Sequence, residues 1–240
     1  MKKIFATLAV LAAIATAASA QNYDYDGFEL AQTSGVDAKF RVAFPMYFGL
    51  STVLNPTYNK AWTAFESQKT QNTILQKSFA YGIEIAGVRF ISNSNPFELS
   101  LAVRYTFMDF ALENTSYTYG KFGDDIIPLL ANLKDIEYDG TKSKIHANYI
   151  GIPARIAYKA GKGKVFAGIS ADYCLSGTYK FKNPKNKGNL DGLFNPFRAS
   201  VEAGFAYGGL GIFLNYGLTP LFANDYSSAN TFTVGLTLGI

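Results

Sequence analysis

Hydrophobic and polar side chains alternate most regularly over residues 148–175, which we predict to form a β-hairpin. Every second residue is apolar or aromatic from Ile150 to Tyr158, and the same pattern runs from Val165 to Leu175. A repeat of two is the repeat of a β-strand with one apolar face. The other face of both arms is small or polar, and each arm has roughly the 9–11 residues that a tilted strand needs to cross a bilayer. The hairpin is therefore typical of a membrane β-barrel.

The same alternation recurs along the chain, and the whole pattern contains eight strands. The predicted strands are residues 39–50, 79–90, 97–107, 148–158, 165–175, 197–207, 210–218 and 232–240. Near Gly87 the apolar positions move to the other face, which indicates a β-bulge. Pro45 and Pro153 lie inside predicted strands and have no N–H to donate, so each predicts a bulge or a break in the hydrogen-bonded ladder.

The connections between the predicted strands alternate in length. Short turns are predicted at 92–96, 161–164 and 208–209, and long loops at 55–74, 112–142, 180–195 and 221–230. Bacterial outer-membrane barrels have an even number of strands, short periplasmic turns and longer outer loops. We therefore predict an all-β fold, an eight-stranded antiparallel up-and-down transmembrane β-barrel over 39–240. The long loops would be extracellular and the termini periplasmic. A turn of helix is predicted at 126–133.

The first 38 residues precede the predicted barrel. Residues 1–20 have a basic start, an apolar stretch and an Ala-Ser-Ala ending, the pattern of a cleaved signal peptide. The alternative is a transmembrane anchor, for which the apolar stretch is short. We interpret residues 21–38 as a periplasmic leader. Loss of the two lysines in 1–20 lowers the formal net charge from +4 to +2, which is no nucleic-acid signature.

Ionic side chains of the predicted strands share the face opposite the apolar one. They are Arg41, Glu84, Glu98, Arg104, Arg155, Asp172, Arg198 and Glu202. An Arg or Lys facing lipid at the midplane costs roughly 2–4 kcal/mol, so we place all eight in the lumen. Eight strands enclose little more than their own side chains. We therefore predict an ion-pair network that fills the lumen, with a gated or selective pore as the alternative.

Composition agrees with a membrane barrel. Aromatic residues make up 15% of the chain and there are 22 glycines, suited to interface girdles and to crowded lumens with tight turns. The predicted girdle aromatics lie near strand ends: Tyr105, Phe107, Tyr158, Tyr173, Phe205 and Tyr207. A mean hydropathy of +0.04 excludes a bundle of transmembrane helices. The single cysteine, Cys174, excludes an internal disulfide and is predicted to lie inside the barrel.

Three features together resemble a known family. They are the predicted signal peptide, the strand YIGIP at 149–153 and the final segment TFTVGLTLGI at 231–240. The chain resembles the Bacteroidetes small outer-membrane β-barrels, often labelled PorT-like or porin-family. The resemblance implies contact with outer-membrane lipid and insertion by the outer-membrane barrel assembly machinery. Such barrels often end in an aromatic residue, where this chain has Ile240.

Candidate chemistry is sparse. His146, the only histidine, is predicted at the outer end of a strand and would need a serine beside it, but Ser143 is three residues away. We predict no catalytic residues, no cofactor and no metal ligands; acidic residues in 112–142 match no calcium loop. The basic loop offers contacts to lipopolysaccharide phosphates, or is simply a solvated loop. Its lysines are Lys180, Lys182, Lys185 and Lys187.

The sequence therefore predicts a non-enzymatic outer-membrane barrel that displays extracellular loops for envelope structure, adhesion or partner contact. The alternatives are a narrow channel or an accessory barrel of a secretion or gliding apparatus, and an enzyme that modifies lipid A or cleaves surface peptides. A soluble periplasmic barrel that binds a lipid would instead require an apolar interior and a polar exterior. Protein partners are not specified by any motif.

Overall fold

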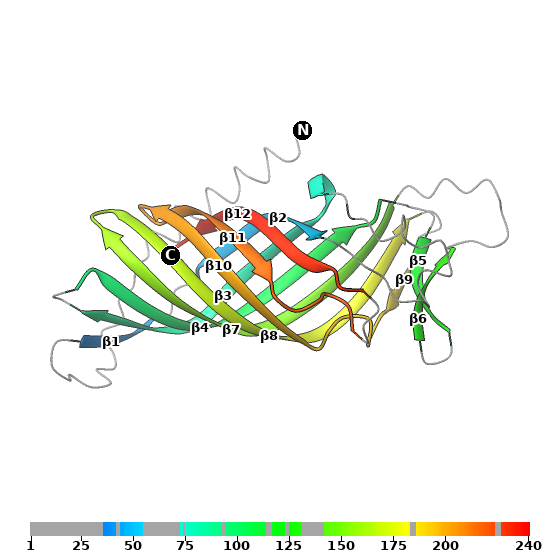
Figure 1. Cartoon of the computed structure of the whole chain (residues 1–240), viewed down its shortest axis with the longest axis horizontal. Helices are drawn as coiled ribbons and strands as arrows, with labels where there is room; N and C mark the ends of the chain where they lie inside the picture. The colour runs from blue at the N-terminus through cyan, green and yellow to red at the C-terminus, as the bar shows by residue number, and fades with distance from the viewer. Residues whose placement is uncertain are drawn as a thin grey trace.

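The computed structural model describes residues 36–41, 44–54, 73, 75–92, 95–113, 117–122, 125–130, 142–182, 186–223 and 227–240. These residues form a long antiparallel β-barrel (Figure 1). Among them, no helix has the length and apolar character needed to span a membrane. The predicted signal peptide and residues 21–35 of the predicted leader lie outside the described residues.

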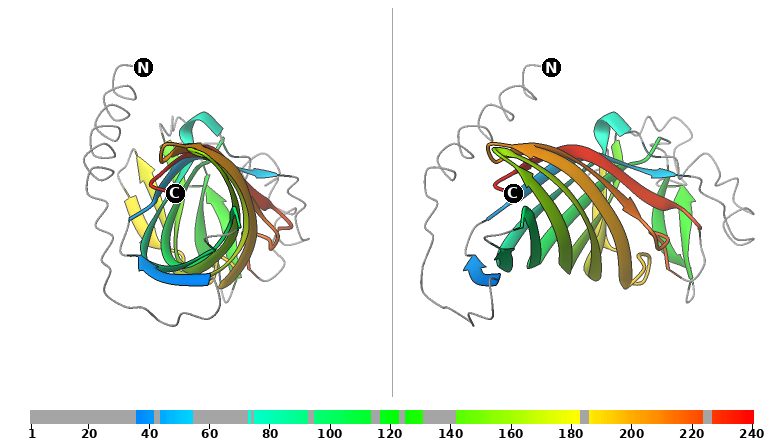
Figure 2. Two further views of the ribbon diagram at one scale, coloured as in Figure 1. Left: turned by 90° about the vertical axis from the view of Figure 1, so that its left-hand side faces the viewer. Right: turned by 60° about the vertical axis from the view of Figure 1, so that its left-hand side comes forward.

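Eight strands close the barrel, and this confirms the predicted fold class. They are β2 Met46–Leu54, β3 Phe79–Ser92, β4 Phe97–Ala111, β7 Lys142–Ala160, β8 Gly163–Lys182, β10 Phe197–Tyr207, β11 Leu210–Gly217 and β12 Asn230–Leu238. Each strand pairs antiparallel with the previous and the next of these eight, and β12 pairs with β2 along its whole length. The ring is closed when it is viewed along its axis (Figure 2, left).

The first predicted strand is split in two. β1 Val36–Arg41 pairs with the second half of β3, and β2 pairs with the first half. Residues 42–45 separate them, and Pro45 lies directly before β2. The Pro45 carbonyl accepts a hydrogen bond from the Glu84 amide at 2.9 Å. The break predicted at Pro45 is confirmed, because a residue without an N–H ends the ladder there.

A register shift between β3 and β4 changes the face that the side chains occupy, and a gap between β4 and β7 interrupts the pairing without changing the register. The register between β3 and β4 shifts between Glu84 and Ala86, so the bulge predicted near Gly87 is centred on Ile85. Between β4 and β7 the paired positions stop at Leu101 opposite Ala154 and resume at Arg104 opposite Gly151. The unpaired stretch of β7 in this gap contains Pro153, which has no N–H to donate to a neighbouring strand.

The two ends of the barrel differ. Short turns join β3 to β4, β7 to β8 and β10 to β11 at one end, here called the turn end. Gly161, Gly208 and Gly209 have positive φ angles of 61°, 59° and 87°, which glycine adopts without strain. The other end, here called the loop end, has the 3₁₀ turn η2 Leu75–Lys77, the hairpin of β5 Tyr117–Phe122 and β6 Asp125–Leu130, and β9 Asn186–Asn189.

Two predicted loops contain strands. The helical turn predicted at 126–133 is wrong, because Asp125–Leu130 is strand β6 and pairs with β5. A short apolar run is ambiguous between helix and strand until a pairing partner is known. The loop predicted at 180–195 is also corrected, since β8 continues to Lys182 and β9 pairs with it. The loop end therefore presents two β-hairpins.

The barrel wall has opposite character on its two sides. On β8 the outward residues are exposed, among them Val165 at 56% and Ile169 at 62%. The inward residues Phe166, Ser170 and Asp172 are buried. The same alternation holds on β4, β10 and β11. A water-soluble lipid-binding barrel has the reverse arrangement, and this pattern excludes that reading of the sequence.

An apolar cluster closes the lumen at the loop end. Phe110, Ile145 and Tyr149 point into the barrel from β4 and β7 and are fully buried. Side chains from the connections and from β5 and β6 pack on them: Tyr119, Ile126, Leu190, Leu193, Phe194, Leu221 and Phe222. An isolated bridge between Phe194 and Phe222 joins two of the connections. We call these ten residues the apolar cap.

Candidate functional site

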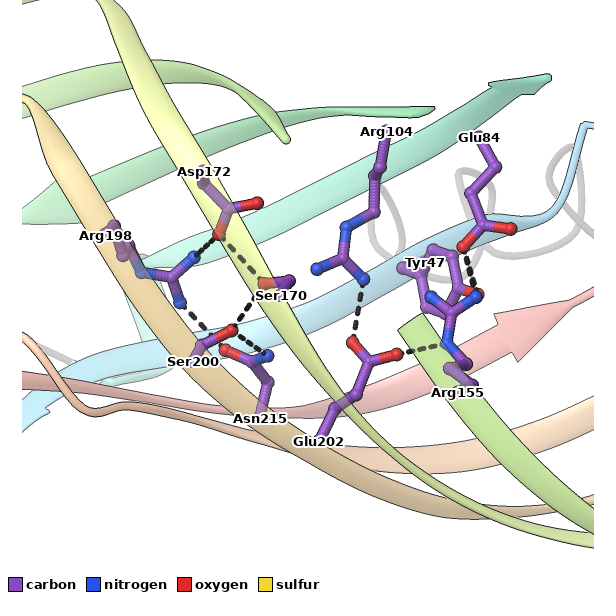
Figure 3. A network of polar contacts seen from close by, with 10 residues as sticks. All are labelled: Tyr47, Glu84, Arg104, Arg155, Ser170, Asp172, Arg198, Ser200, Glu202 and Asn215. Atoms are coloured by element: carbon purple, nitrogen blue, oxygen red, sulfur yellow. Dashed lines mark hydrogen bonds and ion pairs between the residues drawn. The ribbon is translucent and has the colours of Figure 1, made fainter. Parts of the chain in front are cut away.

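The centre of the lumen holds a neutral group of ionic side chains from four strands, drawn in Figure 3. The Glu202 carboxylate pairs with Arg104 at 2.7 Å and also with the Arg155 Nε. The other side of Arg155 pairs with Glu84 at 2.5 Å, and the Tyr47 hydroxyl donates to Glu84 at 2.8 Å. All five side chains are buried. We call them the central network; its two positive and two negative charges balance.

A second group lies towards the loop end, with Arg198 at its centre. Its guanidinium donates to Asp172 at 3.0 Å, to the Asn215 amide oxygen at 2.8 Å and to the Thr231 hydroxyl at 3.2 Å. Ser170 donates to the same oxygen of Asp172 at 3.0 Å. Gly151 lies opposite Asp172, and a Cβ built there would overlap the Asp172 carboxylate. The glycine is needed because the carboxylate occupies the space of its side chain.

A third group lies at the turn end and is unbalanced. The Glu98 carboxylate receives Arg89 at 2.6 Å, Lys159 at 2.8 Å and Lys164 at 3.4 Å. Three cations share one buried carboxylate, which leaves two positive charges in excess among these four residues. Lys159 is partly exposed, so water screens part of this excess.

The predicted lumen residues come together, with one exception that lies outside the described side chains. Seven of the eight are buried, and each of the seven has at least one ion pair with another lumen residue; they are Glu84, Glu98, Arg104, Arg155, Asp172, Arg198 and Glu202. The side chain of Arg41 is not described.

Sequence reasoning missed several members of these groups. Tyr47 and Arg89 were not predicted as lumen residues, although both stand on the polar face of the alternation. For Arg89 the signal was its position between the apolar Val88 and Phe90, after the bulge. The uncharged partner Asn215 gave no such signal, because an amide on a strand does not by itself indicate a buried network.

Two small cavities lie among the buried side chains of the lumen. One cavity of about 40 Å³ lies near Glu98 and Lys164, and another of about 30 Å³ lies between Tyr47 and Asn215. A water molecule requires roughly 10–15 Å³ by the same kind of measure, so each cavity holds a few waters at most.

The outer wall carries a polar cluster at the loop end, around Asp109. Lys144 donates to the Asp109 carboxylate at 2.8 Å and to the Lys77 carbonyl of η2 at 2.9 Å. The His146 Nδ1 lies 3.7 Å from the other Asp109 oxygen, and its ring lies against Phe107 with centroids 5.6 Å apart. We call Asp109, Lys144 and His146 the wall cluster.

Ser143 and His146 lie on opposite faces of β7, because an odd spacing reverses the side of a strand. Ser143 is buried on the inward face, while His146 faces outward beside Asp109. The register partner of His146 on β8 is Thr178. The described residues contain no group of three histidine, cysteine or acidic side chains that could hold a metal ion.

Three of the four predicted lysines lie on β8 and β9 at the loop end, namely Lys180, Lys182 and Lys187. Lys180 and Lys187 are exposed and pair directly across β8 and β9. Lys182 ends β8, but its side chain is not described, and Lys185 lies outside the described residues. Cys174 faces inward beside Tyr149, where it is partly buried against the apolar cap.

Comparison with known proteins gives only distant similarity. No protein-family model and no curated protein sequence matches the chain. Among solved structures, Neisserial surface protein A (NspA) is 10% identical, with a TM-score of 0.39 over 84% of this chain and 99% of that chain. Ail, the attachment invasion locus protein of Yersinia pestis, is 10% identical, with a TM-score of 0.34 over 86% and 99%. LpxR from Salmonella typhimurium is 9% identical, with a TM-score of 0.24 over 89% and 86%. The fold assignment therefore rests on the closed strand pairing of the chain itself.

Proposed function

We propose that the protein is a non-enzymatic integral barrel of the bacterial outer membrane, whose sealed lumen supports hairpins displayed at the cell surface. One observation carries the proposal: large apolar side chains cover the outside of a barrel whose buried interior is ionic. Outward residues exposed by 45% or more include Leu101, Ile152, Val165, Ile169, Ile212 and Leu214. In water such a surface would drive aggregation, whereas lipid chains solvate it.

The height of the apolar surface suits a bilayer. On β8 the outward apolar residues run from Val165 to Leu175, and on β4 from Phe97 to Phe107. Ten residue steps of about 3.3 Å, tilted by about 40°, rise about 25 Å. This equals the usual apolar band of outer-membrane barrels, which is about 25 Å tall.

Aromatic pairs border the band at both ends. Phe97 and Tyr158 have ring centroids 5.3 Å apart at the turn end. Tyr173 and Phe197 are 5.3 Å apart at the loop end, where Tyr81 also stacks on Phe107 at 5.1 Å. Aromatic rings favour the boundary between lipid chains and headgroups. With short turns in the periplasm, as is usual for bacterial barrels, the loop end would be extracellular.

The filled lumen favours a structural or display role over conduction. The central network crosses the interior, and the apolar cap covers the loop end. A conducting path would require two separate closures to open. Among the described residues, the β5–β6 and β8–β9 hairpins lie at the loop end beyond the wall, and they offer surfaces for adhesion or partner contact (Figure 1).

A second candidate function is modification of outer-leaflet lipid. The observation that favours it is the wall cluster, which places an imidazole beside a carboxylate on the lipid-facing side. Mass spectrometry of lipid A from cells that express the protein or its His146→Ala variant tests this candidate. Lipid A altered by the wild type and unaltered by the variant would make the barrel an enzyme and overturn the primary proposal.

The experiment for the primary proposal is gel migration of the full chain extracted from outer membranes, with and without boiling. Closed membrane barrels resist detergent until they are heated, so the unboiled and boiled samples are expected to run at different positions. Recovery in the soluble periplasmic fraction, or equal migration of both samples, would contradict the proposal.

A further inference from the structure

Lysines from three neighbouring strands form one row on the outer wall at the loop end. The register sets Lys144 of β7 opposite Lys180 of β8, and Lys180 opposite Lys187 of β9. Residues directly opposite each other in antiparallel strands have Cβ atoms roughly 4.5–5.5 Å apart. The next backbone pair is Lys142 and Lys182, of which only the backbone is described. We call Lys144, Lys180 and Lys187 the lysine row.

The charge of the row is only partly matched by the described residues of the protein. Lys144 pairs with Asp109 and is buried. Lys180 and Lys187 are exposed, and neither forms an ion pair with another described residue. The acidic residue that follows β9, Asp191, accepts a hydrogen bond from the Asn189 side chain. Two ammonium groups on adjacent strands are therefore left for an external anion.

This arrangement has an energetic cost within the protein. Like charges directly opposite each other destabilise a strand pair. The β8–β9 pairing has only four register positions, from Thr178 opposite Asn189 to Phe181 opposite Asn186, so one repulsive pair is a large part of it. A phosphate held between the two ammonium groups would reverse the sign of this interaction.

The row lies beyond the apolar band. Leu175 is the last outward apolar residue of β8, and Lys180 follows it by five residues. Lys180 still faces outward despite the odd spacing, because the register between β7 and β8 shifts at Leu175, which has no partner between Cys174 and Ser176. At about 3.3 Å per residue and a tilt of about 40°, Lys180 stands roughly 13 Å above the edge of the band. In the proposed orientation, this is the level of the phosphorylated sugars of the outer leaflet, while Tyr173 and Leu175 face the lipid chains below.

We propose that the two exposed ammonium groups of the lysine row, those of Lys180 and Lys187, bind phosphate groups of lipopolysaccharide, and that the apolar wall beneath them receives the acyl chains of the same molecule. The ammonium groups act as compact, rotatable charges suited to phosphate. The proposal rests on the proposed function, because it needs the loop end in the outer leaflet.

The test measures binding of purified lipopolysaccharide to the full chain in detergent, by thermophoresis of the labelled protein. The double variant Lys180→Gln/Lys187→Gln is expected to bind on the order of tenfold more weakly, and added salt is expected to shrink the difference. Lys162→Gln is the matched control, because Lys162 is an exposed lysine in the turn between β7 and β8, at the opposite end of β8 from Lys180. Its affinity is expected to equal that of the wild type.

Two further ligands separate the sources of binding. Lipopolysaccharide from which the phosphates have been removed is expected to bind the wild type and the double variant equally weakly. Equal binding of intact lipopolysaccharide by both proteins would overturn the site, as would binding of heparin without binding of lipopolysaccharide. Heat-dependent gel migration of the same samples reports on the barrel, so its loss in the wild type would instead contradict the proposed function.

Discussion

Arg104 and Glu202 form an ion pair of 2.7 Å although their strands, β4 and β10, are not neighbours in the ring. β7 and β8 lie between them, so the bond crosses the lumen (Figure 3). The number of strands and the stagger of their hydrogen bonds set the width of the barrel, and a side-chain bond of this kind ties non-adjacent parts of the wall together. The interior is therefore held by side chains as well as by the wall.

The first prediction concerns Glu202, which neutralises two arginines. Glu202→Gln keeps the shape of the side chain but removes its charge. The two arginines Arg104 and Arg155 are then balanced by one negative charge, that of Glu84. Loss of one partner from a buried ion group costs roughly 3–5 kcal/mol, so the free energy of unfolding is expected to fall by about that amount. Urea titration of the refolded barrel measures it. Lys162→Gln serves as the surface control, and an equal urea midpoint for both variants would speak against a stabilising network.

The second prediction concerns the lipid-facing wall. Ile169 is 62% exposed near the middle of β8, and an arginine there is expected to lower stability in bilayers by roughly 2–4 kcal/mol. Asn189→Arg introduces the same side chain at an exposed position beyond the apolar band and is expected to change stability little. Folding into lipid vesicles at increasing urea compares the two. No penalty for Ile169→Arg would indicate water, not lipid, at that position.

The third prediction concerns Gly151. A Cβ at this position overlaps the Asp172 carboxylate, so Gly151→Ala is expected to displace Asp172 from Arg198. Forced overpacking of an interior costs roughly 1–3 kcal/mol. The urea midpoint is expected to fall accordingly. Combining Gly151→Ala with Asp172→Gly, which removes the obstructing carboxylate, is expected to cost less than the sum of the two single changes; simple additivity would argue against the contact.

The fourth prediction concerns conduction. The wild-type protein is expected to give no steady current steps in planar bilayers, because the central network and the apolar cap close the lumen at separate levels. Glu202→Ala alone is also expected to be silent, since Phe194 and Phe222 still cover the loop end. Regular current steps from the wild type would favour the narrow-channel alternative.

The alternation of apolar and polar residues was sufficient to predict the eight strands. In each strand one face carries apolar residues suited to lipid, and the other carries small or polar residues suited to a crowded lumen. It also predicted the effect of Pro45, since a missing N–H is visible in the sequence. The bulge was displaced by two residues, from Gly87 to Ile85, because several residues near a change of face satisfy the same pattern.

The loop end was predicted least well. The β5–β6 hairpin lies on apolar residues of the cap, so its strands have no regular alternation with water or lipid. The wall cluster could not be predicted either, because it depends on which strands pair. Asp109 and Lys144 are polar residues at outward positions, and only the pairing of β4 with β7 brings their side chains together.

The central claim is that lipid surrounds the outer wall, and fluorescence quenching tests it most directly. Cysteines that replace Leu101 or Ile169 in a Cys174→Ser background can carry an environment-sensitive dye, with Lys162→Cys as the control at an exposed turn. In reconstituted vesicles, lipids with a nitroxide on the acyl chain are expected to quench the dye at 101 and 169 strongly and the dye at 162 weakly. Quenching at 101 and 169 by iodide in the water phase, with no effect of the nitroxide lipids, would contradict the account.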